Sequence, residues 1–132
     1  MRIDSDLLAI QEVRNLVEGA AAAQVVIKEF TQEKTDRIVQ AMAEAGEDAA
    51  EWLAKLAVEE TGLGVWQDKA VKNLLATRSV HDHIKGMKTV GIIRHLKERR
   101  VIEIAEPAGV IAGLIPTTNP TSTAMYKCLI AL

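Results

Sequence analysis

Apolar side chains recur every three or four positions through the first 85 residues, which is the spacing of amphipathic helices. Breaks in this pattern divide the stretch into four segments. The predicted helices cover residues 5–23, 32–45, 47–60 and 65–85.

Local signals set the ends of these helices. Asp4, Ser5 and Asp6 offer caps for the first helix, and Thr31 is a predicted N-cap for the second. Gly46 is the predicted terminator of the second helix, so that Glu47 and Asp48 open the third. The Thr-Gly-Leu-Gly run at 61–64 breaks the third helix. Spacing predicts inward faces for the third and fourth helices, formed by Ala49, Trp52, Leu53, Leu56 and Ala57, and by Trp66, Ala70, Val71, Leu74 and Leu75.

After Gly86 the pattern favours strands. Val90–Leu96 and Val101–Ala105 are rich in β-branched residues, and a charged run at 97–100 separates them. This arrangement predicts a β-hairpin. In its second strand isoleucines alternate with Glu103, so one face of the hairpin is expected to be solvated.

A third pattern begins after Pro107. Residues 109–115 are apolar without alternation, which is typical of a strand buried on both faces of a parallel sheet. Pro116 ends this predicted strand, and a polar turn follows through Pro120. The hydroxyl residues at 121–123 are predicted N-caps of a last helix.

These elements predict an α/β fold. A buried parallel strand needs parallel neighbours, which are reached by a crossover that usually contains a helix. Here the crossover helix begins and the sequence ends at Leu132, within apolar residues. We therefore expect the front part of a longer protein. The competing interpretation is a small self-contained α+β domain.

Composition narrows the functional class. The chain has 132 residues, 48% of them apolar, with one cysteine and a net charge of −2. Such a balance argues against a nucleic-acid binder with a basic face, and one cysteine excludes an internal disulfide. No stretch reaches the length of a membrane span, and the acidic start is unlike a signal peptide. We expect a cytoplasmic protein that binds neither nucleic acid nor membrane.

The turn Pro116-Thr117-Thr118-Asn119-Pro120 is the first candidate for chemistry. Ligands of open α/β sheets bind beyond the carboxyl ends of the strands, which is the predicted place of this loop. Its hydroxyls, its carboxamide and the amides of the next helix suit an oxyanion or a phosphate. The plainer interpretation is a proline-bounded turn whose side chains satisfy local backbone groups.

Other reactive residue types are weaker candidates. Cys128 lies among apolar residues of the last helix, so we expect a small buried hydrophobe rather than a nucleophile. His81 and His83 stand two apart on a helix, point to different faces, and have no supporting cluster of ligands. We therefore predict no metal site, and a solvated helix end around Asp82.

The stretch Ile104–Ala124, which contains Pro116-Thr117-Thr118-Asn119-Pro120, resembles the start of the coenzyme-binding domain of CoA-acylating aldehyde dehydrogenases. The resemblance is strongest to the aldehyde dehydrogenase part of bifunctional aldehyde-alcohol dehydrogenases and to their stand-alone relatives. Two upstream stretches, Val58–Gly64 and Met87–Gly91, are similar to the same family, so the resemblance spans nearly the whole chain.

The resemblance implies an oxidoreductase. Such enzymes convert an aldehyde, NAD (or NADP) and coenzyme A, the co-substrate, to acyl-CoA, and also run the reverse reduction. A cysteine thiolate adds to the aldehyde, a hydride passes to the nicotinamide, and CoA attacks the resulting thioester. The family's cysteine lies far downstream of this region, so the resemblance implies that these 132 residues alone are inactive.

Site residues are carried over only where the motif matches. Related enzymes read Pro-Trp-Asn-x-Pro and place an asparagine amide at the oxyanion. An ungapped register puts Thr118 at that asparagine, with Asn119 next to it. The resemblance therefore implies oxyanion stabilisation by Asn119 and Thr118 together. It also implies cofactor contacts through the backbone of Ile115, Pro116 and Thr117.

The resemblance also implies an organisation. We expect a helical region at 1–86, a hairpin at 87–106 that serves as the oligomerisation element, and at 107–132 the first β-α unit of a Rossmann-like domain. The full-length protein is then expected to be a homo-oligomer acting on a small aldehyde or acyl-CoA. The rival hypotheses are a non-acylating NAD(P)-dependent aldehyde dehydrogenase and a non-enzymatic helical interaction module.

Overall fold

The computed structural model describes residues 4–132 and is mostly helical, with a two-stranded hairpin. The helices α1 to α3 span Ser5–Ile27, Gln32–Asp48 and Ala50–Thr61. A continuous helical run comprises α4 (Trp66–Leu74), a π-helix (Leu75–Ser79) and α5 (Val80–Ile84). The strands β1 (Gly91–Leu96) and β2 (Val101–Ala105) flank a 3-10 turn, Lys97–Arg99, and α6 spans Pro120–Ala131.

The described residues divide into two compact units. One joins the chain up to Thr31 with Thr89–Ile111, and the other joins Gln32–Lys88 with Ala112–Leu132. The first therefore contains α1 and the hairpin, and the second contains α2 to α6.

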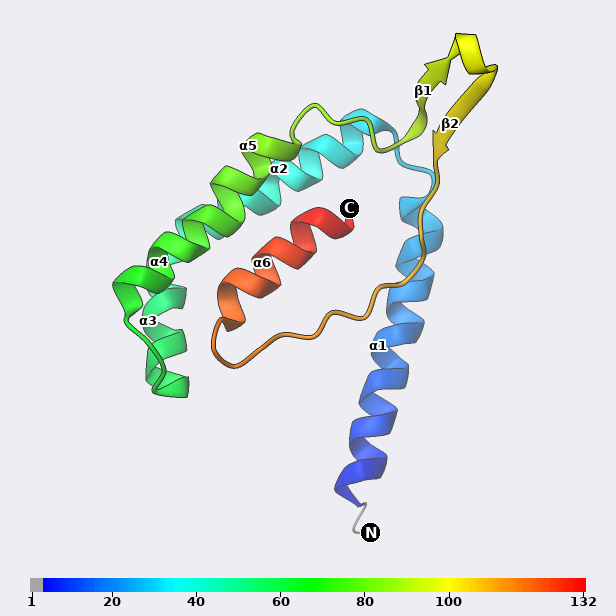
Figure 1. Ribbon diagram of the computed structural model, residues 1–132. Helices are drawn as coiled ribbons and strands as arrows, with labels where there is room; N and C mark the ends of the chain where they lie inside the picture. Colours follow the sequence, from blue (N-terminus) through cyan, green and yellow to red (C-terminus); the bar gives the residue numbers. More distant parts are fainter. Residues whose placement is uncertain (1–3) are drawn as a thin grey trace. The chain divides into compact units, whose positions relative to one another are not determined.

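In the second unit, α2 and the α4–α5 run lie side by side and antiparallel (Figure 1). At one end, Nε2 of Gln32 donates to the carbonyl of Met87 at 3.3 Å. At the other end, Nδ2 of Asn73 donates to the carbonyl of Ala50 at 2.8 Å. The last helix, α6, packs on the π-helix, α4 and α2.

A small apolar core forms where these helices meet. Val39 and Ala43 of α2 and Leu129 of α6 are buried together, and four half-buried side chains pack around them: Met42, Val80, Ile84 and Leu132. The contact between α3 and α4 uses small residues instead, since Ala54 and Ala57 are buried there. Most of the buried apolar residues of this unit are alanines, which let the helices approach one another closely.

Gly46 does not terminate the second helix. The helix α2 continues to Asp48, and α3 begins only at Ala50, so the predicted start at Glu47 and Asp48 is also wrong. A Cβ atom at position 46 would lie 2.5 Å from Cγ2 of Thr77. Gly46 is therefore explained by the close approach of α2 to the π-helix, a contact that local helix signals cannot reveal.

The predicted inward faces of α3 and α4 are confirmed only in part, since Ala57 is buried but four of the ten predicted residues are exposed: Trp52, Leu56, Val71 and Leu75. Trp52 is 57% exposed and Val71 67% exposed, whereas the buried positions of the α4 run are Lys69, Asn73, Ala76 and Thr77. Polar side chains take the inward face because they hold partners on α3 and α6. By contrast, the predicted end of α3 is confirmed, since Gly62 caps it in the left-handed conformation.

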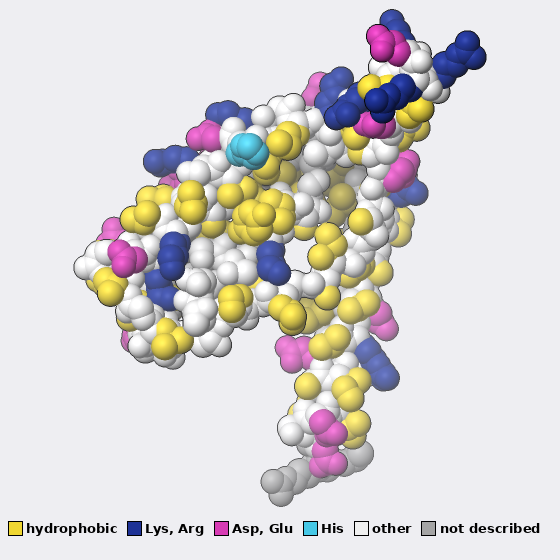
Figure 2. Space-filling view, viewed as in Figure 1, with side chains coloured by type: hydrophobic (Ala, Val, Ile, Leu, Met, Phe, Trp, Pro, Cys, Tyr) yellow, Lys and Arg dark blue, Asp and Glu magenta, His cyan; other side chains and the backbone are white. Residues whose placement is uncertain are grey.

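The first unit has a different character. None of the residues of α1 is buried, and apolar side chains lie along its visible face (Figure 2). The hairpin forms as predicted, with Gly91 opposite Ala105 and Leu96 opposite Val101. The expected solvation is reversed, since Ile102 and Ile104 are each more than half exposed while Glu103 is partly covered, beside Arg94.

The predicted parallel strand at 109–115 is not formed. Within the described residues the only sheet pairs β1 with β2, and the chain from Glu106 to Pro116 has no regular structure. Its apolar side chains are exposed, Leu114 to 87%. A parallel strand requires neighbours for its backbone groups, and no other described segment supplies them. The α/β expectation is therefore met here only by helices and a hairpin.

Cys128 is exposed, so the expectation of a buried hydrophobe is wrong. Its neighbour Leu129 is 2% exposed and takes the core position of α6. Consecutive helical residues point about 100° apart, so Cys128 can face outward while the next residue, Leu129, faces the core.

Candidate functional site

The loop 116–120 leads directly into α6, and its shape depends on two prolines. Pro120 occupies the first turn of α6, where a fixed φ and a missing N–H are tolerated. The amide of Asn119 donates to the carbonyl of Pro116 at 3.3 Å, which closes the turn. Asn119 is thus the N-cap residue, and the predicted caps at 121–123 lie inside the helix instead.

The carboxamide of Asn119 faces α4 rather than its own helix. Its side chain makes no capping hydrogen bond, and Oδ1 accepts from Nζ of Lys72 at 3.3 Å. An ammonium only donates, so the amide oxygen is the end that faces Lys72. Among the described residues, Nδ2 of Asn119 has no hydrogen-bond partner, which leaves two donors available to a ligand.

Lys69 holds the preceding residue. Its Nζ donates to the backbone carbonyl of Thr118 at 2.6 Å, and the lysine is only 6% exposed. Lys69 and Lys72 lie one helical turn apart on α4, so they bind consecutive residues of the loop. Two ammonium groups beside the loop also favour a negatively charged ligand there.

Asn73 anchors the start of α6. This asparagine is fully buried, donates to the carbonyl of Ala50 and accepts a 2.8 Å hydrogen bond from Oγ1 of Thr121. The hydroxyl of Thr77, also fully buried, donates to the backbone carbonyl of Asn73 at 2.8 Å. Such back-bonding bends helices, and here it lies where α4 passes into the π-helix.

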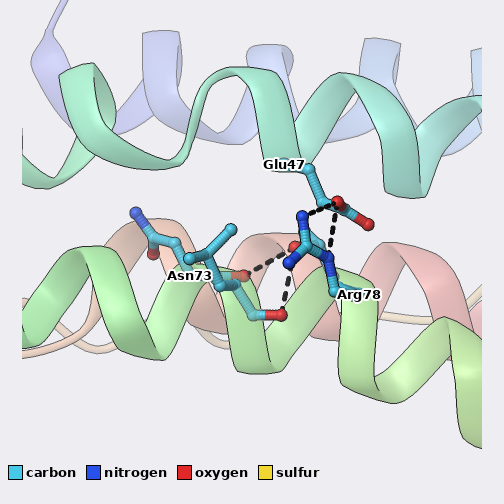
Figure 3. Close-up of polar contacts among 5 residues, drawn as sticks. Glu47, Asn73 and Arg78 are labelled. Carbon is cyan, nitrogen blue, oxygen red and sulfur yellow. Dashed lines mark hydrogen bonds and ion pairs between the residues drawn. The ribbon is translucent and has the colours of Figure 1, made fainter.

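Glu47 and Arg78 join α2 to the π-helix on the outer side of this network (Figure 3). Nη2 of Arg78 lies 2.8 Å from Oε2 of Glu47, and Nε donates to the same oxygen at 2.9 Å. The arginine side chain is 62% exposed, so the pair contributes little to stability. The ion pair joins α2 to the π-helix and makes no contact with the loop 116–120.

The structure brings some predicted site residues together and leaves others apart. Thr118 and Asn119 both contact α4, while Ile115, Pro116 and Thr117 form an exposed backbone strip before them. Sequence reasoning missed Lys69 and Asn73. Their only signal was two polar residues four apart on one helical face, where an apolar face was expected.

His81 and His83 belong to α5. Nowhere in residues 4–132 do three or more histidine, cysteine or acidic side chains gather as metal ligands. Asp82, between the histidines, accepts a hydrogen bond from Lys85. That hydrogen bond, and to a lesser extent the lysine charge, holds the pKa of Asp82 below its ordinary value of 3.8.

Among the helices within residues 4–132, none combines the length and the apolar composition that a membrane span requires.

Comparison with known proteins decides the family. The model of the aldehyde dehydrogenase family matches residues 7–132. The chain belongs to the aldehyde dehydrogenase family. Membership places the loop 116–120 in an enzyme family and favours the aldehyde dehydrogenase hypotheses over a purely helical interaction module.

Several relatives of this aldehyde dehydrogenase chain are acylating enzymes. It is 45% identical over 123 residues to the bifunctional aldehyde-alcohol dehydrogenase of Escherichia coli, covering 93% of this chain and 14% of that protein. It is 41% identical to the acetylating succinate-semialdehyde dehydrogenase of Clostridium kluyveri, covering 91% of this chain and 26% of that protein. The chain thus corresponds to the N-terminal part of acylating aldehyde dehydrogenases.

A solved structure has a similar fold. The acetylating aldehyde dehydrogenase from Geobacillus thermoglucosidasius is 54% identical, with a TM-score of 0.95 over 98% of this chain and 29% of that one. The present chain therefore spans less than a third of the relatives it matches.

Proposed function

We propose that the protein carrying this chain oxidises an aldehyde with NAD(P)+ and coenzyme A to an acyl-CoA, and catalyses the reverse reaction. The observation that carries the proposal is the similarity to enzymes named as acetylating or acylating, along more than nine-tenths of the chain. Those names favour this reaction over that of a non-acylating aldehyde dehydrogenase, in which water attacks the thioester.

In this proposal the chain contributes a scaffold and one loop. Asn119 is the proposed donor to the oxyanion, because its oxygen is engaged by Lys72 and its Nδ2 is available. The Thr118 hydroxyl is the second proposed donor, on the neighbouring residue. Cys128 is not the proposed nucleophile, because it lies on α6 near the far end from this loop. We therefore place the reacting cysteine outside residues 1–132.

The exposed backbone of Ile115, Pro116 and Thr117 fits one end of a nicotinamide cofactor. Ile115 precedes the turn that the hydrogen bond from Asn119 to Pro116 closes, and Pro116 and Thr117 are the first residues of that turn. All three residues are exposed, which leaves their peptide groups able to line a ribose. The chain has no glycine-rich phosphate loop, so the proposal assigns these peptide groups to the nicotinamide ribose and not to the pyrophosphate. When bound, NAD(P)+ supplies the hydride acceptor.

The hairpin is the proposed oligomerisation element. Within the described residues its sheet has two strands, so each strand has an unpaired edge. Ile92, Ile102 and Ile104 are all more than half exposed on it. An interface with a second copy would cover these apolar side chains and pair an edge.

The proposed reaction is tested by following NADH formation at 340 nm. The protein carrying this chain is supplied with NAD+ and acetaldehyde, succinate semialdehyde or sulfoacetaldehyde, with and without CoA. We expect NADH only when CoA is present, in amounts equal to the acyl-CoA formed. Equal rates without CoA would favour the non-acylating alternative, and no NADH with any of the three aldehydes would contradict the proposal. The 132-residue chain alone serves as an inactive control.

A further inference from the structure

Lys69 is placed where a lysine is costly. Its side chain is 6% exposed, and among the described residues it makes no ion pair with a carboxylate. Burial of an ammonium without a countercharge is unfavourable unless its donors are satisfied. The side-chain hydrogen bond of Lys69 goes to the carbonyl of Thr118. Its position is therefore explained by what it holds in the loop.

The turn before α4 is shaped around this side chain. Gly64 has a φ of +77°, and a Cβ atom there would lie 3.3 Å from Cε and 3.6 Å from Nζ of Lys69. The absence of a side chain at position 64 leaves room for the end of the lysine. Lys69 thus lies between the 61–64 turn and the loop.

The hydrogen bond to Thr118 constrains Asn119 directly. The carbonyl of Thr118 and the amide N–H of Asn119 belong to one planar peptide unit. Lys69 binds the oxygen of that peptide unit, and the N–H of the same unit, which belongs to Asn119, donates to the carbonyl of Pro116. Fixing this plane fixes the point from which the Asn119 side chain leaves the backbone, and Lys72 then fixes its amide oxygen.

We infer that Lys69 is a positioning residue, which orients the Asn119 carboxamide by holding the peptide unit between Thr118 and Asn119. Lys69 itself touches neither substrate nor cofactor in this assignment. The role of the oriented carboxamide in catalysis rests on the proposed function, whereas the hold on the loop does not.

The test uses the protein carrying this chain, with three variants. Lys69→Met removes the ammonium and keeps an unbranched apolar stem, and Lys69→Arg keeps a charged donor. The matched control is Lys85→Met, because Lys85 is an exposed lysine directly after the same helical run and its ammonium pairs with Asp82.

The first readout is hydrogen–deuterium exchange of the peptide covering residues 113–123. We expect the amide of Asn119 to exchange at least tenfold faster in Lys69→Met, with the wild-type rate in Lys85→Met, because local protection reports the stability of the turn. An unchanged exchange rate in Lys69→Met would overturn the inference. If Lys69→Met does not fold, Lys69→Arg decides, since a retained donor is expected to preserve most of the protection, and exchange as fast as in an unstructured peptide would overturn it.

The second readout is the kinetic split. We expect Lys69→Met to lower kcat about tenfold to a hundredfold with little change in KM for the aldehyde, and Lys69→Arg to recover part of it. A variant that changes KM alone, or that matches Lys85→Met, would contradict the positioning role. An inactive wild type would overturn the proposed function, and the exchange readout would still decide the inference.

Discussion

The two units of this chain contain similar apolar residues and use them differently. In the second unit, Val39 and Leu129 are nearly inaccessible, and helices approach closely through alanines and Gly46. In the first unit, α1 has no buried residue although it contains long aliphatic side chains such as Val13 and Leu16. Apolar content alone therefore does not produce a buried core. Small residues, which admit close approach, and buried polar side chains with partners decide where helices meet.

The largest expected effect is at Asn73. Replacement Asn73→Ala removes two hydrogen bonds of a fully buried side chain and leaves the Ala50 carbonyl and the Thr121 hydroxyl without their partner. We expect the free energy of unfolding to fall by about 3 kcal/mol. Urea unfolding followed by tryptophan fluorescence reports it, since Trp52 and Trp66 both belong to the second unit. A loss below about 1 kcal/mol would mean that the polar network does not organise this unit.

A matched pair of valines compares the units directly. Val39→Ala deletes buried methyl groups and should cost about 2 kcal/mol, because the cavity is only partly refilled. Val13, which is 59% exposed in the middle of α1, should tolerate the same change or gain up to about 0.5 kcal/mol, because alanine is the better helix former. Unfolding followed by circular dichroism measures both. Equal costs at the two positions would contradict the contrast between the units.

Gly46→Ala tests the close helix approach. In a solvated helix this change is stabilising by about 1 kcal/mol, but here the new methyl meets Cγ2 of the buried Thr77 at 2.5 Å. We expect a net loss of about 1–3 kcal/mol. Thr77→Ser removes that methyl and keeps the hydroxyl, so the double variant should recover most of the loss. A stabilising Gly46→Ala would show that the two helices are not in contact there.

The smallest expected effect lies at the exposed end of α5. The pKa of Asp82 is lowered by Lys85, so the carboxylate stabilises the fold above the unfolded pKa, near 3.9, and this contribution is lost as the pH falls through the lowered value. A carboxyl titration by nuclear magnetic resonance should show that the pKa of Asp82 moves up towards its ordinary value in Lys85→Met. The same pKa with and without the lysine would remove its assigned cause.

Local signals predicted those parts of the fold that depend on neighbouring residues. The hairpin follows from two β-rich runs around a charged turn, and Gly62 ends α3 because glycine accepts the left-handed conformation. The start of α2 directly after Thr31 was predicted in the same way.

Long-range contacts explain what the sequence did not predict. Position 46 inside α2 is a glycine because a Cβ atom there would collide with Thr77. Lys69 faces inward because it donates to the carbonyl of Thr118, which lies 49 positions away in the sequence. The strand predicted at 109–115 depends on partners that no described segment provides. In the loop, Thr118 and Asn119 were predicted as candidates, but their anchors on α4 were not, because a periodic pattern counts lysine and asparagine as outward residues.

The most direct test of the proposed role of Asn119 compares it with its neighbour Thr118. Asn119→Ala and Thr118→Ala are assayed for CoA-dependent NADH formation in the protein carrying this chain. Removal of one oxyanion donor typically lowers kcat by about a hundredfold to a thousandfold. We predict that loss for Asn119→Ala. For Thr118→Ala we predict a smaller loss of kcat, because its hydroxyl is only the second proposed donor and alanine retains the backbone carbonyl that Lys69 binds. A wild-type kcat in Asn119→Ala, or an equal loss in Thr118→Ala, would contradict the account.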